Sequence, residues 1–219
     1  MAPGMPRYIS RRGARRQQTF FYEEDYRAYL RLMAEWCSNW KVEVWAYCLM
    51  PNHVHLIAVP PSKEALAGAV AEAHRRYTCR VNLREDWSGH LWQERFSSFP
   101  LDETHLFTAT RYIELNPVRA GLVEGPWQYP WSSAAAHLSG CDDRLARVKP
   151  LLKMFRDWRE YLARDIPEED VQALKRYERT GRPLGGAAFL AGIEEAPGRA
   201  LRPRKSGQKD PGGSRRTNN

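Results

Sequence analysis

The chain has 219 residues, of which 42% are hydrophobic, and its formal net charge is +8. This length and hydrophobic content suffice for one core without disulfide bridges, which excludes a disordered chain and a disulfide-built one. No stretch approaches the roughly 18 apolar residues that cross a bilayer, and residues 1–16 contain no hydrophobic signal stretch. We therefore expect a cytoplasmic protein without a membrane partner.

The positive charge is concentrated at the two ends of the chain. Residues 1–16 carry a net +5 and residues 199–219 a net +6, whereas residues 17–198 sum to −3. A basic end is typical either of a solvated arm or of a segment that associates loosely with nucleic acid. Glycine, proline, arginine and lysine dominate from residue 181 onward, which predicts a flexible basic tail over 181–219.

The first half of the chain is predicted to contain three strands and two helices. Apolar residues recur every three or four positions over 22–39, and three acids begin this segment, which indicates an amphipathic helix. Alternation over 42–48, a Met-Pro-Asn turn and a β-branched segment over 53–59 indicate two strands joined by a tight turn. A first strand is expected at 6–10, and a helix capped by Ser62 is expected to run toward residue 81.

The second half is predicted to be mainly helical. A strand is expected around 95–99, followed by a helix over 104–115 that Asn116-Pro117 ends, because proline disfavours helix in the residue before it. Further helical stretches are expected at 132–138, 151–163 and 168–180.

The four cysteines are widely spaced and form no Cys-x-x-Cys pair, so that neither a zinc ribbon nor a redox dithiol is indicated. We interpret them as reduced and mostly buried thiols: Cys37, Cys48, Cys79 and Cys141.

His53 and His55 lie on one predicted strand, where side chains at i and i+2 project to the same face. Both imidazoles could therefore bind one metal ion. Two histidines alone do not define a metal site, and such a pair in a strand is often an ordinary surface or core pair. The tight turn before them would hold the ring positions rigidly.

Tyr112 and Asn116 lie four residues apart on a predicted helix and share one face of it. Taken alone, such a pair is more often a core tyrosine and an ordinary asparagine cap before proline.

Taken together, these motifs resemble the REP-associated tyrosine transposases of bacteria, which belong to the single-tyrosine HUH transposases. The resemblance rests on the segments Met50–Val59 and Arg111–Val123 and extends to 7–21, 89–96 and 127–133. It implies a catalytic domain over residues 5–140, a helical C-terminal extension over 141–180 and the basic tail over 181–219. The implied fold is α+β, an antiparallel sheet with helices packed on it in a ferredoxin-like or RRM-like arrangement.

The resemblance also implies a set of site residues. Tyr112 matches the family's nucleophile, His53 and His55 its metal ligands, and Asn116 its third, amide-type ligand. The expected activity is nicking and rejoining of single-stranded DNA beside hairpins, with Mg²⁺ or Mn²⁺ and through a 5′-phosphotyrosine link. Such a link preserves bond energy, which agrees with the lack of a Gly-x-x-x-x-Gly-Lys phosphate loop. We expect a nucleoid-associated monomer that uses its own tyrosine.

The residues that hold the DNA are less sharply indicated. Candidate base-stacking residues are Tyr77, Trp92 and Phe96, although most aromatic residues of such a chain should be core. The candidate phosphate contacts are Arg11, Arg12, Arg15, Arg16, Arg75, Arg76, Arg80, Arg95, Arg111 and Arg119.

Two other functions were weighed against this one. A histidine-triad nucleotide hydrolase or transferase also carries His-hydrophobic-His on a strand, but it would need a third histidine where this chain has Ile57. A domesticated DNA-binding protein or repressor that acts on repeat hairpins without cutting them is the stronger alternative. The presence of Tyr112 and its possible metal ligands favours the enzyme.

Overall fold

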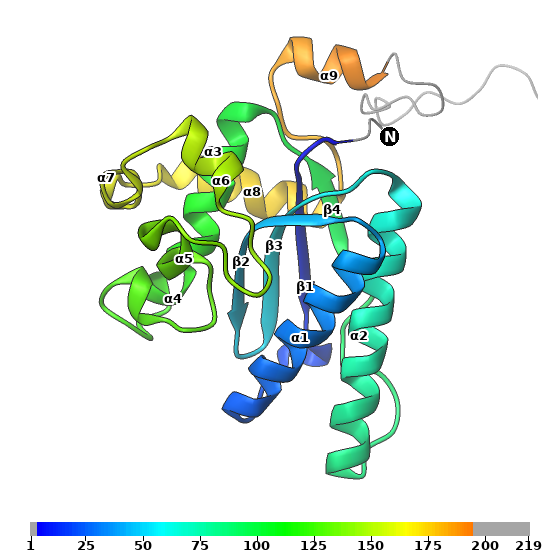
Figure 1. Cartoon of the computed structure of the whole chain (residues 1–219). Coiled ribbons are helices and arrows are strands. Elements are labelled where there is room, and N and C mark those ends of the chain that lie inside the picture. The colour runs from blue at the N-terminus through cyan, green and yellow to red at the C-terminus, as the bar shows by residue number, and fades with distance from the viewer. Residues whose placement is uncertain (1–3, 195–219) are drawn as a thin grey trace, which may run out of the picture.

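The computed structural model describes residues 4–194 (Figure 1). Its centre is a four-stranded antiparallel sheet with the strand order β2-β3-β1-β4. The predicted antiparallel sheet with helices packed on it is confirmed, and the β-α-β-β-α-β connection is the ferredoxin-like one. Its elements are β1 (Arg7–Arg12), α1 (Glu23–Asn39), β2 (Glu43–Met50), β3 (His53–Val59), α2 (Lys63–Glu85) and β4 (Ser97–Pro100).

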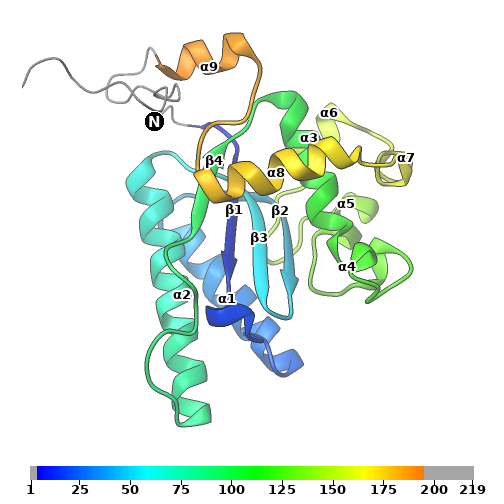
Figure 2. The ribbon, with the colours of Figure 1, turned by 180° about the vertical axis from the view of Figure 1, so that it is seen from behind.

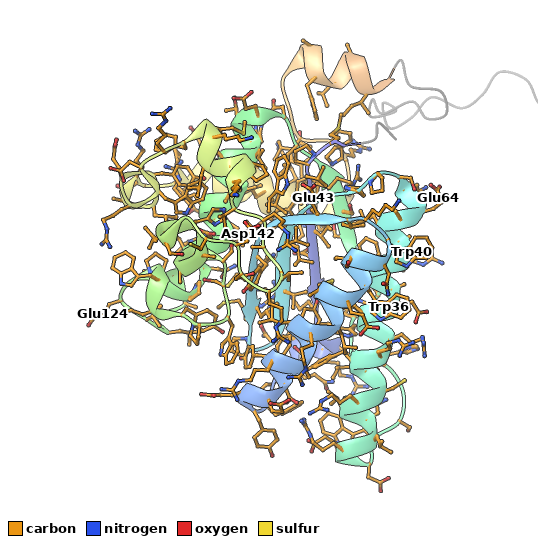
Figure 3. All side chains as sticks on the ribbon, in the orientation of Figure 1. Trp36, Trp40, Glu43, Glu64, Glu124 and Asp142 are labelled. Atoms are coloured by element: carbon orange, nitrogen blue, oxygen red, sulfur yellow. The ribbon has the colours of Figure 1, made fainter. Side chains whose placement is uncertain are left out.

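Helices α1 and α2 pack side by side on one face of the sheet (Figure 1). Trp36 and Trp40 project from α1 beside α2 (Figure 3), and Gly68 makes the close approach possible. A Cβ atom at position 68 would lie 2.5 Å from the Trp40 ring, so that a side chain there would displace this ring from its place against α2. Ser62 caps α2 as predicted, because its Oγ accepts a hydrogen bond from Ala65 N at 3.1 Å.

The opposite face of the sheet carries α3 (Glu103–Glu114) and α8 (Glu168–Thr180) (Figure 2). Helix α3 lies against β2 and β3, and α8 crosses β4 and β1. The remaining elements are η1 (Ala14–Arg16), α3 (Glu103–Glu114), α4 (Asn116–Arg119), η2 (Pro126–Gln128), α5 (Ala134–Ser139), α6 (Lys149–Met154), α7 (Trp158–Ala163), α8 (Glu168–Thr180) and α9 (Ala187–Glu194).

A segment around Trp131 covers the outer edge of β2. Leu49 N donates a hydrogen bond to Trp131 O at 2.8 Å, and Ser133 N donates to Tyr47 O at 3.0 Å. The Tyr129 hydroxyl donates to Leu49 O at 2.8 Å. Because an uncovered edge strand leaves its backbone groups unpaired, this cover protects β2 from pairing with another chain.

Several predicted elements differ from the observed ones. The helix predicted at 151–163 is two helices, α6 and α7, because Phe155 is extended and the Asp157 side chain caps a new helix start. The helix predicted over 104–115 ends at Glu114, directly before Asn116-Pro117 as expected, but a separate short helix, α4, begins at Asn116, since proline is tolerated in a first turn. Strand β1 continues to Arg12, two residues beyond the predicted end.

The C-terminal part differs from expectation as well. Residues 181–194, expected to be flexible, include a bridge from Leu184 to Leu101 and helix α9. The rest of the predicted tail, 195–219, lies outside the described residues. Cys37 and Cys48 are buried, whereas Cys79 and Cys141 are exposed. Across residues 4–194 we find no helix both long and apolar enough to cross a membrane.

Candidate active site

The sheet register brings His53 and His55 together at the start of β3. His53 pairs with Arg12 across the strands and His55 with Ser10. The two imidazole centroids lie 4.7 Å apart with their planes at 82°. The Tyr112 ring of α3 lies 6.0 Å from the His55 ring, which places both histidines on the α3 face of the sheet.

Each histidine is held through its Nδ1 atom. His53 Nδ1 is 2.6 Å from Asn52 Oδ1, and His55 Nδ1 is 2.8 Å from the Tyr8 hydroxyl. When each Nδ1 carries the proton, each Nε2 keeps a lone pair. His55 Nε2 is buried without a hydrogen-bond partner among the described residues. Buried polar atoms normally have a hydrogen-bond partner, so the free lone pair of His55 Nε2 fits the role of a metal ligand.

Burial keeps both imidazoles neutral. It lowers the pKa of His53 to about 2, with further lowering by His55 and Arg12, and it lowers the pKa of His55 to about 3, with Arg12 acting in the same direction. A neutral imidazole is the form that binds a metal.

We expect acid to destabilise the metal-free fold through these histidines. Between pH 6.5 and about 3, His55 binds a proton in the unfolded chain but not in the folded one, so that stability falls as the pH falls. At pH 5, His55 alone should cost about 2 kcal/mol relative to neutral pH. Urea denaturation in EDTA at pH 7 and pH 5 measures this. H55Q should reduce the difference in unfolding free energy between the two pH values, whereas H90Q, at an exposed histidine, should leave this difference unchanged.

Tyr112 points from α3 toward the histidines and is only 8% exposed. Burial raises the pKa of its hydroxyl, and the half-buried Glu178 of α8 raises this pKa further. Arg119 and Arg12 act in the opposite direction, and the Arg119 guanidinium lies 4.8 Å from the centre of the Tyr112 ring. Both arginines would therefore stabilise a phenolate or a neighbouring phosphate.

Asn116 lies one helical turn beyond Tyr112, at the start of α4. Its amide nitrogen is buried without a hydrogen-bond partner among the described residues. No cluster of three or more His, Cys, Asp or Glu side chains within residues 4–194 could hold a metal ion. A third protein ligand to a cation here would have to be of another type, such as the amide oxygen of Asn116, which exchanges places with the amide nitrogen when the amide group is rotated by half a turn.

Some of the predicted DNA-binding arginines lie at or near the candidate site, and the others lie away from it. Arg12 and Arg119 lie at the site itself. Arg15 and Arg16 are exposed just after β1, where Arg16 O accepts a hydrogen bond from Asn52 Nδ2 at 3.1 Å. Arg111 lies on α3 with its guanidinium 5.2 Å from the Tyr161 ring.

Other arginines of the predicted set do not converge on Tyr112. Arg11 is part-buried against α2, where it is 2.8 Å from His74 Nδ1 and also donates to Glu94 O. Arg75 and Arg76 are paired with Glu72 on α2, and Arg80 is 4.0 Å from Glu24. These helices cover the opposite face of the sheet. Arg95 is exposed in the loop before β4.

Two of the three candidate stacking residues are core residues. Tyr77 is fully buried and Trp92 is 4% exposed. Tyr77 donates its hydroxyl proton to Thr19 O at 2.6 Å, so that it supports the α2 face of the sheet. Neither ring is accessible to a base, and only Phe96 remains partly exposed.

Three residues near the site were absent from the sequence prediction. Tyr8 and Asn52 orient the histidines, and Glu178 acts on Tyr112. The contact of Asn52 with His53 could be predicted from the sequence, because the two residues are adjacent. Nothing in the sequence announces Tyr8 or Glu178, because only the pairing of β1 with β3 and the packing of α8 bring them there.

Known proteins match the same part of the chain. The sequence profile of a family described as "Transposase IS200 like" matches residues 11–116. A Haemophilus influenzae protein described as a REP-associated tyrosine transposase is 30% identical over 108 residues. The match covers 44% of this chain and 61% of that relative, so the chain spans about three fifths of the relative's length.

Two solved structures are also similar. A REP-associated tyrosine transposase bound to a REP hairpin aligns with a TM-score of 0.55 and 19% identity, over 67% of this chain and 88% of that one. This similarity shows a shared fold. A Deinococcus radiodurans protein described as a transposase aligns over 52% of this chain and 92% of its own, with 19% identity and a TM-score of 0.37.

Proposed function

We propose that this protein is a metal-dependent transposase that nicks and rejoins single-stranded DNA beside hairpins, because residues 11–116 match the IS200-like transposase family and a REP-associated tyrosine transposase is 30% identical over 108 residues. The observation that carries the proposal is the 6.0 Å separation between the Tyr112 and His55 rings, with no hydrogen-bond partner for His55 Nε2 within residues 4–194. Nucleophile and metal ligands belong to one chain. The arrangement therefore supports the use of the chain's own Tyr112, as in the proposed monomer.

The proposed reaction begins with the Tyr112 hydroxyl. Its oxygen loses its proton to solvent as it attacks the scissile phosphorus, and the bond from phosphorus to the 3′ oxygen breaks. The products are a 5′-phosphotyrosine and a free 3′-OH, which takes up a proton. A later 3′-OH attacks the same phosphorus, releases Tyr112 and rejoins the strand. Because each step exchanges one phosphate ester for another, no external energy source is needed.

His53, His55 and Asn116 would hold the cation, Mg²⁺ or Mn²⁺. When bound, such an ion polarises the phosphate and offsets the charge that develops on its oxygens. Arg119 and Arg12 add positive charge beside Tyr112, which counters the rise in its pKa caused by burial and Glu178. Asn52 and Tyr8 keep the imidazoles oriented.

The hydroxyl of Tyr8 provides a test of the metal site. Y8F keeps the ring, which stacks on Phe99 with centroids 5.0 Å apart, but deletes the oxygen beside His55 Nδ1. We expect Mn²⁺ affinity, measured by isothermal titration calorimetry, to fall about 10- to 100-fold. Y29F is the matched control, because it removes a 2.7 Å Tyr–His74 contact on the other face. Equal affinities for Y8F and wild type would contradict the metal assignment.

The proposed DNA partner is a single-stranded hairpin. A structural relative is described as bound to a REP hairpin. The exposed Arg15 and Arg16 follow directly after β1, whose last residue, Arg12, lies at the site. The basic ends of the chain add positive charge that attracts DNA phosphates.

The alternative is a domesticated protein that binds such hairpins without cutting them. The two proposals differ in one product, a covalent protein–DNA adduct. Purified protein, a 3′-labelled single-stranded hairpin and Mg²⁺ or Mn²⁺ should yield a labelled adduct that survives denaturing electrophoresis and needs the metal, whereas a 5′ label should leave with the released 3′-OH fragment. Tight binding without an adduct in either metal would favour the non-catalytic protein.

A further inference from the structure

A buried carboxylate on α3 has no part in the chemistry proposed above. Glu114 is fully buried, two residues after Tyr112 and two before Asn116. At about 100° per residue, its side chain leaves the helix on the side away from both of them. It faces α5 and α7 instead of the candidate metal site.

Three donors from outside α3 surround this carboxylate. Ser133 Oγ donates to Glu114 Oε1 at 2.6 Å, and His137 Nδ1 lies 2.6 Å from the same oxygen. Trp158 Nε1 donates to Oε2 at 2.8 Å. The His137 and Trp158 rings stack, with centroids 4.2 Å apart and planes at 13°. All four residues are buried, so that each hydrogen bond is made without competition from water.

Ser133 ties this network to the sheet. Tyr47 N donates to Ser133 Oγ at 3.0 Å, and Ser133 N donates to Tyr47 O at 3.0 Å. The next residue of β2, Cys48, pairs with His55 across the strands. The network therefore connects the helix that carries Tyr112 with the strand beside the histidines.

We propose that Glu114 is a positioning residue, which fixes the rotation of α3 and so the place of the Tyr112 hydroxyl relative to His55. The inference rests on the proposed function. Apolar contacts tolerate small rotations of a helix, whereas three hydrogen bonds to one carboxylate weaken steeply when their angles change. A displacement of about 1 Å at a reacting group can cost about 100-fold in rate.

The test compares E114Q with E103Q, an equal change of charge at an exposed position of the same helix. The glutamine keeps the shape, but its amide NH₂ must face one of the three donors. With hairpin DNA at saturation, single-turnover adduct formation by E114Q should be at least about 10-fold slower than by wild type. Its DNA dissociation constant should stay within about twofold. E103Q should match wild type in both.

If E114Q does not fold, W158F removes one donor while keeping a ring, and the same split between rate and binding is expected. Unchanged rates in the folded variants, or parallel losses of rate and binding, would overturn the inference. Crystal structures of wild type and E114Q provide a test that does not depend on cleavage. The Tyr112 ring should move relative to His55 in the variant, and an unchanged ring position would contradict the inference. Absence of any wild-type adduct would instead refute the proposed function.

Discussion

Y112F is expected to abolish adduct formation, with a loss of at least about 10⁴-fold, because the neighbouring Tyr8 hydroxyl is fully buried against His55 Nδ1 and cannot reach a phosphate in its place. The substitution removes one oxygen atom and keeps the ring beside His55 and Arg119. Hairpin binding should therefore stay within about twofold of wild type. Adduct yield on a denaturing gel and DNA affinity by fluorescence anisotropy measure the two quantities.

Y22F is the matched control, since Tyr22 is 62% exposed at the start of α1 and its loss of a hydroxyl should change neither quantity. If Y112F forms as much adduct as wild type does, another residue must be the nucleophile. Peptide mapping of the adduct formed by wild type would then identify that residue.

H55Q should produce the second-largest effect. Loss of the buried Nε2 takes away one of two imidazole ligands, so both Mn²⁺ affinity and metal-dependent adduct formation should fall by more than about 100-fold. H90Q, at an exposed histidine, should retain both. Raising the Mn²⁺ concentration should partly restore H55Q activity but not Y112F activity.

This difference in rescue separates a ligand from a nucleophile. If excess metal restores neither variant, His55 serves the structure of the sheet and the metal site must lie elsewhere. If H55Q binds Mn²⁺ as wild type does, the ligand assignment fails directly.

Much of the fold followed from local patterns. Strand β3 begins at His53 as predicted, and Ser62 caps α2, because alternation and capping depend on neighbouring residues alone. The misjudged helix over 151–163 has a local cause too. Phe155 is extended and Asp157 starts a new helix, which apolar spacing does not reveal.

The site divides in the same way. The sequence alone determined that His53 and His55 share a strand face and that Tyr112 and Asn116 share a helix face, since both follow from backbone periods. Tertiary structure decided that these two faces meet. It also decided that Tyr8 and Arg12 join them and that Arg75, Arg76 and Arg80 lie across the sheet.

The physical reason is the range of the interactions. A periodicity constrains residues a few positions apart, whereas the pairing of Ser10 with His55 and the contact of His137 with Glu114 depend on how whole elements pack. The net charge shows the same limit. Its sum of +8 indicated a nucleic-acid partner, but only the packing separated the two arginines beside Tyr112 from those paired with acids on α1 and α2.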